Sequence, residues 1–197
     1  MRRRALIAAT AVAAGLAVAG CGSGVSGSAP ASAPNPNVAE VNPAGDIPDN
    51  QAFVAYAPPG GGYSIKVPEG WARVAAGRAV TFTDKLNSIR LETHRAATPL
   101  TVRTGTRTVL PMLGRTVPGF VAGDVTSVTR SGGKGVLVTY LARSAPDPVT
   151  GKTGVDAVER YAFHHAGREV VVTLSGPNGA DNVDPWMTVT DSLRWTP

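Results

Sequence analysis

The chain has 197 residues, with 19 lysines and arginines against 14 aspartates and glutamates, and one cysteine, Cys21. Without the three arginines at positions 2–4, 16 basic residues face 14 acidic ones, a net charge of only +2. With no basic stripe carrying interleaved aromatic residues, this charge argues against a nucleic-acid-binding protein. After Cys21 no thiol remains, which excludes disulfides and Cys-based metal sites from the rest of the chain.

The first predicted element is a signal peptide over residues 1–20. Its basic start is followed by the apolar segment 5–19, which as a helix would span about 22 Å, less than the roughly 30 Å of a hydrocarbon core. The run Leu16-Ala17-Val18-Ala19-Gly20-Cys21 resembles a lipobox, in which small residues admit the backbone to the peptidase and the thiol receives a diacylglycerol. We therefore expect lipidation of Cys21 at the extracytoplasmic face of the cell membrane.

Two alternatives stay open at this end of the chain. Ala17-Val18-Ala19 also fits ordinary secretory cleavage, with Cys21 incidental, although the lack of any later cysteine favours the lipobox. The pair Arg3-Arg4 loosely resembles a twin-arginine export signal, so the sequence does not decide between that route and general secretion.

A tether is predicted over residues 21–50. This segment is rich in Gly, Ser, Ala, Pro and Asn and holds no aromatic residue. Such a composition buries too little apolar surface to offset the entropy of ordering, so we expect a disordered spacer. The alternative is that part of it packs on the domain that follows.

From Ala52 onward the chain shows short strands separated by turns. Alternation of apolar and polar residues, typical of half-buried strands, occurs over 63–67, 80–83 and 88–92. Two hairpins follow, one joining 120–130 to 135–143 through Ser131-Gly132-Gly133-Lys134, the other joining 157–164 to 168–174 around Ala166-Gly167. The triplets 136–138 and 170–172 are apolar on both faces, so these two strands are expected inside the sheet, covered on both sides.

Two segments depart from the strand pattern. Residues 108–117 place apolar side chains near helical spacing, with Pro111 in the first turn. Asp184-Pro185 predicts a second helix, with Asp184 as N-cap and Pro185 at the first helical position. Its apolar face would consist of Trp186, Val189 and Leu193.

Several short motifs together resemble one family. The segment Tyr63-Ser64-Ile65-Lys66-Val67-Pro68-Glu69-Gly70-Trp71 is similar to the strand–turn–tryptophan opening of PsbP-like domains, while 161–163, 170–174 and 191–195 resemble their last hairpin and C-terminal helix. With the lipobox, this order is most similar to the LpqN-type lipoproteins. The resemblance implies an α+β fold over residues 51–197, an antiparallel sheet flanked by helices in an α/β/α sandwich. From the residues alone, the turn at 68–70 aims Trp71 onto the domain as a structural side chain.

No catalytic, cofactor-binding or metal site is predicted. Gly151-Lys152-Thr153 is not a phosphate loop, because Pro146 stands where that motif needs a glycine. His164 and His165 are neighbours in a strand and point to opposite faces, so they cannot easily share a metal. Loop aspartates are expected as solvated groups or caps rather than calcium ligands; they are Asp147, Asp156, Asp181 and Asp184. The loop 146–154 is expected as an exposed connection, or alternatively as a docking loop.

These observations predict a non-enzymatic binding or scaffold module, held at the membrane by the lipid on Cys21, that docks a protein of the cell envelope. Two alternatives are carried with it. One is a carrier that holds a lipid or other apolar small molecule between sheet and helix. The other is a hydrolase whose Ser and His come together only in the fold. No cofactor and no nucleic-acid partner are expected.

Overall fold

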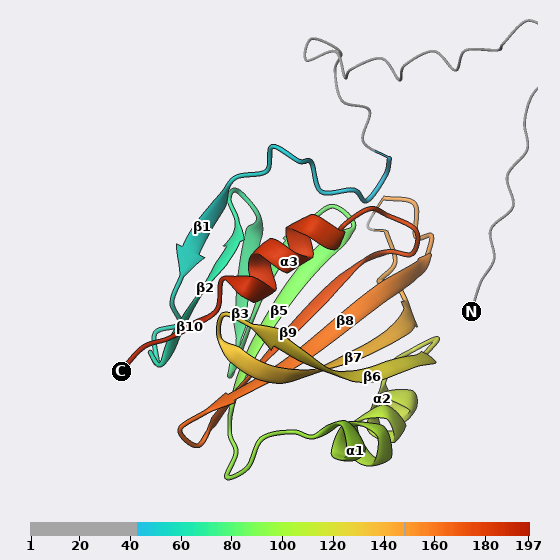
Figure 1. The fold of residues 1–197 in the computed structure, drawn as a ribbon. Coiled ribbons are helices and arrows are strands. Elements are labelled where there is room, and N and C mark those ends of the chain that lie inside the picture. Colours follow the sequence, from blue (N-terminus) through green and yellow to red (C-terminus); the bar gives the residue numbers. More distant parts are fainter. Residues whose placement is uncertain (1–42, 148) are drawn as a thin grey trace, which may run out of the picture. The chain divides into compact units, whose positions relative to one another are not determined.

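The computed structural model describes residues 43–147 and 149–197, which form two antiparallel sheets flanked by helices (Figure 1). The predicted signal peptide, Cys21 and most of the predicted tether lie outside these residues. The larger sheet has seven strands, in the order β3 (Ala72–Ala76), β4 (Ala79–Asp84), β5 (Asn87–Arg95), β9 (Arg168–Pro177), β8 (Val155–His165), β7 (Gly133–Arg143) and β6 (Val121–Arg130). The smaller sheet consists of β1 (Phe53–Tyr56), β2 (Tyr63–Pro68) and β10 (Arg194–Trp195).

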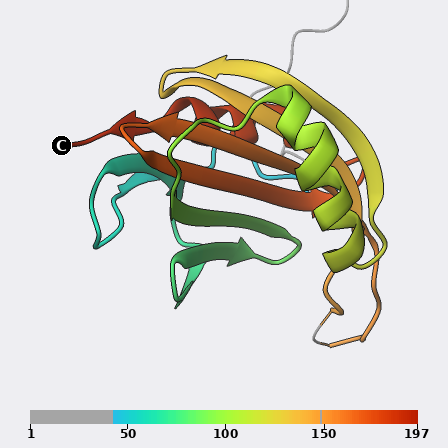
Figure 2. The same cartoon turned by 90° about the horizontal axis from the view of Figure 1, so that it is seen from below.

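Helices cover both faces of the larger sheet. On one face the continuous helical segment α1 (Val102–Thr104), η1 (Gly105–Val109, a π-helical turn) and α2 (Leu110–Thr116) packs Leu113 against Val136 and Val138 of β7. Figure 2 shows this segment inside the bend of β6 and β7. On the other face, α3 (Val183–Asp191) and the smaller sheet enclose the main core. The expected α+β arrangement of an antiparallel sheet between helices is confirmed.

Strands stand where alternation predicts them. The three segments 63–67, 80–83 and 88–92 become β2, β4 and β5, and the two predicted hairpins become β6–β7 and β8–β9. Ala166 and Gly167 have φ values of 47° and 76°, the left-handed geometry of a tight two-residue turn. Val170, Val171 and Val172 are at most 2% exposed because β9 lies at the centre of the sheet.

The C-terminal segment differs from its prediction in two respects. The residue before α3 is Asn182, and Asp184 lies within the first helical turn, so Asp184 is not the N-cap. The helix ends at Asp191, and the fully buried Leu193 belongs to an extended segment that leads into β10. Pairing of Arg194 and Trp195 with β2, a contact distant in sequence, overrides local helical spacing here.

The first predicted helix is longer than expected. It begins at Val102, where the Thr101 side chain accepts a hydrogen bond from the Thr104 amide at 3.1 Å. The part over 108–117 is confirmed, with Pro111 in the first turn of α2. The turns before it are rich in threonine, which has modest helix propensity, and this composition conceals the start from pattern analysis.

Part of the segment assigned to the tether packs on the domain. Ile47 is only 4% exposed and belongs to the main core, and its amide donates to Asn182 Oδ1 at 2.8 Å. The carbonyl oxygen of Gly45 accepts from Asn87 Nδ2 at 2.9 Å and from Asn182 Nδ2 at 3.0 Å. The expected boundary at residue 51 is therefore wrong: two buried asparagines hold the chain onto the domain from Gly45 onward.

Candidate functional site

A pocket of about 900 Å³ lies between the smaller sheet and one end of the larger sheet. Five segments contribute its lining: the end of β1 and the loop 57–62, the start of β2, the β3–β4 turn, the end of β5 and the β8–β9 turn. These turns lie at the opposite end of the domain from residues 43–50 (Figure 1). The pocket is formed by contacts between segments far apart in sequence.

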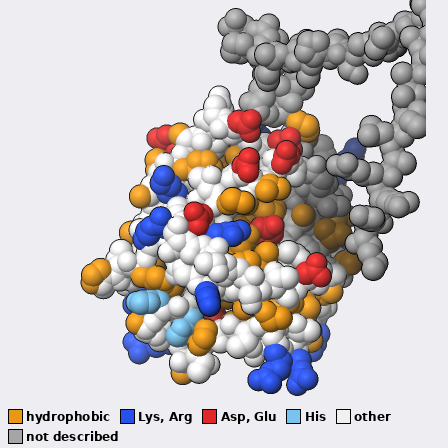
Figure 3. Space-filling model, in the orientation of Figure 1, with side chains coloured by type: hydrophobic (Ala, Val, Ile, Leu, Met, Phe, Trp, Pro, Cys, Tyr) orange, Lys and Arg blue, Asp and Glu red, His pale blue; other side chains and the backbone are white. Residues whose placement is uncertain are grey.

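The rim of the pocket is basic. Arg78, Arg95 and Arg168 line it, and no aspartate or glutamate does. Figure 3 shows acidic side chains mainly toward the upper end of the molecule, and both histidine and basic side chains toward its lower end. The positive charge of the pocket lining therefore comes from arginines, and such a lining favours an anionic ligand over a cationic one.

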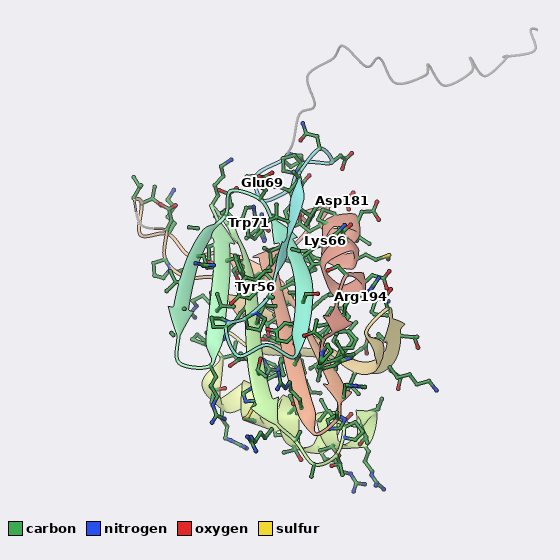
Figure 4. All side chains as sticks on the ribbon, turned by 90° about the vertical axis from the view of Figure 1, so that its left-hand side faces the viewer. Tyr56, Lys66, Glu69, Trp71, Asp181 and Arg194 are labelled. Carbon is green, nitrogen blue, oxygen red and sulfur yellow. The ribbon has the colours of Figure 1, made fainter. Side chains whose placement is uncertain are left out.

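The walls of the pocket are apolar and aromatic. Tyr56, Tyr63, Val80 and Leu91 line it, and the Tyr56 ring meets Phe82 edge-on with centroids 5.1 Å apart. Figure 4 shows Tyr56 in the space between β1–β2 and β3–β4, below Trp71. Such walls, combined with a few polar groups, are typical of small-molecule sites.

Burial controls the chemistry of the inner phenol. Tyr63 is 1% exposed, and burial raises the pKa of its hydroxyl; the neighbouring Tyr56 adds to this effect, while Thr93 and Arg168 partly offset it. The hydroxyl therefore stays protonated at physiological pH and can donate a hydrogen bond into the pocket.

Glycines shape the entrance. Gly62 has a φ of 89°, and a side chain there would collide with the Arg168 guanidinium, since a Cβ atom would lie 1.5 Å from Nη1. Arg168 Nη1 donates to the carbonyl oxygen of Gly61 at 2.6 Å. The loop before β2 and the turn before β9 are thereby joined, and Arg168 is fixed at the pocket wall.

A second group of charged side chains lies elsewhere on the larger sheet. Glu92 binds Arg90 at 3.1 Å and Arg160 at 3.3 Å. Burial raises the pKa of Glu92, but the bonds and charges of the two arginines outweigh it and lower the pKa below its usual value. A carboxylate held ionised in this way stabilises the sheet and is unsuited to donate a proton.

The residues singled out in the sequence lie in separate places. His164 Nε2 is 2.9 Å from the carbonyl oxygen of Ala96, whereas His165 stacks on Trp195 with centroids 5.3 Å apart. Trp71 packs against the main core, which confirms its structural role. Cys21 and the predicted recognition residues Leu16, Ala17, Val18, Ala19 and Gly20 lie outside the described part of the chain.

The loop between β7 and β8 is an exposed connection, as expected. Asp147 Oδ1 accepts hydrogen bonds from the Thr150 amide at 2.7 Å and from the Val149 amide at 3.0 Å, and these bonds, led by those of Thr150, lower the pKa of Asp147. Within residues 43–147 and 149–197, no group of three or more His, Cys, Asp or Glu side chains is placed to hold a metal ion. In the same part of the chain, none of the helices has the length and apolarity needed to span a bilayer.

No protein-family model matches the chain, and no curated protein matches it at a significant level. Among solved structures, the PsbP protein of Synechocystis sp. PCC 6803 (CyanoP) aligns with a TM-score of 0.52 at 14% identity, over 77% of this chain and 98% of that one. LpqN of Mycobacterium tuberculosis, described as involved in cell envelope biogenesis, aligns with a TM-score of 0.43 at 15% identity, over 76% and 93%.

A longer protein from Bacteroides thetaiotaomicron aligns with a TM-score of 0.47 at 11% identity, over 73% of this chain, which spans about half (48%) of that protein. At such low identities the likeness concerns the fold alone. Membership among the LpqN-type lipoproteins therefore stays a prediction, whereas the alignment with CyanoP shows that residues 43–197 have a PsbP-like fold.

Proposed function

We propose that this chain is an extracytoplasmic lipoprotein, anchored through Cys21, whose PsbP-like domain is a non-enzymatic module that binds a small molecule between its two sheets. The observation that carries the proposal is the pocket of about 900 Å³, which falls within the size range of small-molecule sites. Of the two binding roles predicted from the sequence, this geometry favours the carrier. Docking of a cell-envelope protein by the same domain stays a prediction.

The position of the pocket differs from the one expected for a carrier. The space between α3 and the sheet is filled, because Trp186 and Val189 pack in one core with Phe163 and Leu174. A ligand would instead enter between the loop 57–62 and the end of β5. The proposed site is therefore formed between the smaller and the larger sheet, without the helix.

The side chains of the pocket support binding rather than covalent catalysis. No serine, cysteine or carboxylate lines it beside His94. Thr93 is the next residue to His94 in β5, and neighbouring strand residues point to opposite faces, so this hydroxyl and this imidazole do not form a nucleophile–base pair. The phenols and guanidinium groups that line the pocket are suited to bind and orient a ligand through hydrogen bonds.

A tryptophan at position 75 is expected to block the pocket. Ala75 lies opposite Val80 across β3 and β4, so both side chains face the pocket. We expect Ala75→Trp to weaken binding of the neutral fluorophore N-phenyl-1-naphthylamine by about tenfold or more, since each 1.4 kcal/mol of lost contact is a factor of about ten. The measurement is a fluorescence titration of the chain from residue 22 onward.

Val74→Trp is the matched control, because Val74 is the neighbouring residue on the opposite face of β3 and is 64% exposed. It should bind the probe as the unaltered chain does. Failure of the unaltered chain to bind the probe, together with the absence of any added mass on protein gently purified from its own cells, would refute the proposed pocket function.

Lipidation is expected to depend on Cys21 alone. Cells that express the full chain should incorporate labelled palmitate into it, and Cys21→Ala should abolish the label, because the thioether to diacylglycerol forms at that sulfur. Ser23→Ala, two residues further on, should keep it. A mature chain that begins at Gly20 and carries no lipid would instead show ordinary cleavage after Ala19.

A further inference from the structure

Three arginines line the pocket, and no acidic residue lines it with them. Arg78, Arg95 and Arg168 come from three separate segments, and Arg95 lies directly opposite Arg168 in the β5–β9 pair. Like charges placed opposite each other in a sheet are destabilising. The two side-chain ion pairs found among the described residues both belong to Glu92, so none of the three arginines is neutralised that way. An anion bound among them would relieve this repulsion.

The donors of Arg168 are directed by the protein. One guanidinium nitrogen donates to the carbonyl oxygen of Gly61, which anchors the group at the pocket wall. Because a guanidinium has five N–H donors, the remaining ones stay available for a ligand. Planar guanidinium groups bind the oxygens of carboxylates and phosphates through paired hydrogen bonds.

Apolar surface adjoins these donors. Tyr56, Val80 and Leu91 line the same pocket, and the protonated Tyr63 hydroxyl adds a donor near Arg168. A small hydrated anion such as inorganic phosphate would leave these walls without a partner. A neutral hydrocarbon would leave the arginines unpaired.

We infer that the ligand of this pocket is an amphiphilic anion, with a carboxylate or phosphate head bound by Arg78, Arg95 and Arg168 and an apolar body against Tyr56, Val80 and Leu91. The inference rests on the proposed function and names its ligand class. The head group is common to free acids and to anionic lipids.

Displacement of the neutral fluorophore tests the inference, with three competitors of nearly equal hydrocarbon length: decanoate, decyl phosphate and decanol. We expect both acids to displace the fluorophore at concentrations about tenfold lower than decanol, because hydrogen bonds to charged groups are about twice as strong as neutral ones. The more effective of the two acids identifies the head group. The effect should shrink as salt is raised, since screening weakens exposed charges.

The double variant Arg78→Gln/Arg95→Gln removes two exposed charges and should reduce displacement by the acids about tenfold or more while leaving decanol unchanged. Arg107→Gln/Arg115→Gln, which removes two exposed arginines from η1 and α2, is the matched control and should change nothing. If decanol competes as well as the acids, or the double variant leaves the acids unaffected, the inference is overturned and the pocket function stands. If the fluorophore itself does not bind, the proposed function fails first.

Discussion

Asn182→Ala should lower the free energy of unfolding by about 3 kcal/mol. Its side chain is 3% exposed and makes three hydrogen bonds: Oδ1 accepts from the Ile47 amide at 2.8 Å, and Nδ2 donates to Gly45 O at 3.0 Å and to Asn87 Oδ1 at 3.1 Å. Alanine would leave the Ile47 amide and the Asn87 carboxamide without these partners. Each buried polar group left unsatisfied costs about 1–3 kcal/mol. Urea unfolding measures the loss.

Asn178→Ala is the control, because Asn178 is exposed in the turn after β9 and should cost less than about 0.5 kcal/mol. A second readout separates a local change from a global one. Hydrogen exchange at the Ile47 amide should accelerate in Asn182→Ala beyond what the loss of global stability explains. Equal stability of the two variants would contradict the role of Asn182 in holding residues 45–47.

Phe163→Ala should cost about 3–5 kcal/mol, the range for removing a fully buried phenylalanine. Phe163 has no exposed surface, lies in β8 opposite Gly135 and Val170, and stacks on Tyr161 with centroids 6.0 Å apart. Gly135 makes room for the ring, since a Cβ atom there would lie 2.8 Å from Phe163 Cδ1. Because Gly135 has no side chain that could move into the vacated space, the cavity would stay open on that side.

Phe120→Ala serves as the comparison for Phe163. Phe120 is only partly buried and packs at the edge of the smaller apolar cluster between β7 and α2, with its ring centroid 5.4 Å from that of Tyr140. Phe120→Ala should lower the free energy of unfolding by less than half as much in the same urea experiment, because the Phe120 ring buries less apolar surface than that of Phe163. If both variants were equally stable, the main core would not be centred on β8 and β9.

Local sequence patterns were sufficient to predict the strands and hairpins in which alternation or turn residues are pronounced. Alternation predicted β2, β4 and β5, and the glycine-containing turns predicted both long hairpins. β3 was missed because Ala72–Ala76 is alanine-rich and exposed throughout, so it shows no alternation and is a strand only through its pairing with β4. The burial of Ile47 was missed for a related reason: one apolar residue in a polar segment contains no periodicity.

The pocket could not be predicted from local patterns. Its arginines lie at positions 78, 95 and 168. In the sequence, each one indicates only an exposed charge near the end of a strand. Only the antiparallel register between β5 and β9 sets Arg95 opposite Arg168. The Ala166-Gly167 turn predicted the hairpin that positions Arg168. It gave no indication that the loop 57–62 packs beside Arg168 and accepts its hydrogen bond through Gly61.

Gly45 and Ile47 are hydrogen-bonded to the side chains of Asn87, which begins β5, and of Asn182, which precedes α3. These bonds determine where the domain first bears a mechanical load. A pull on the chain from its N-terminal side is borne first by the hydrogen bonds to Asn87 and Asn182. Asn87 begins β5, whereas the pocket residues of that strand, Leu91 and Thr93–Arg95, stand about 13–26 Å further along it at roughly 3.3 Å per residue. Tension would therefore load residues 43–50 before it reached β1 and the pocket-lining loop that follows β1.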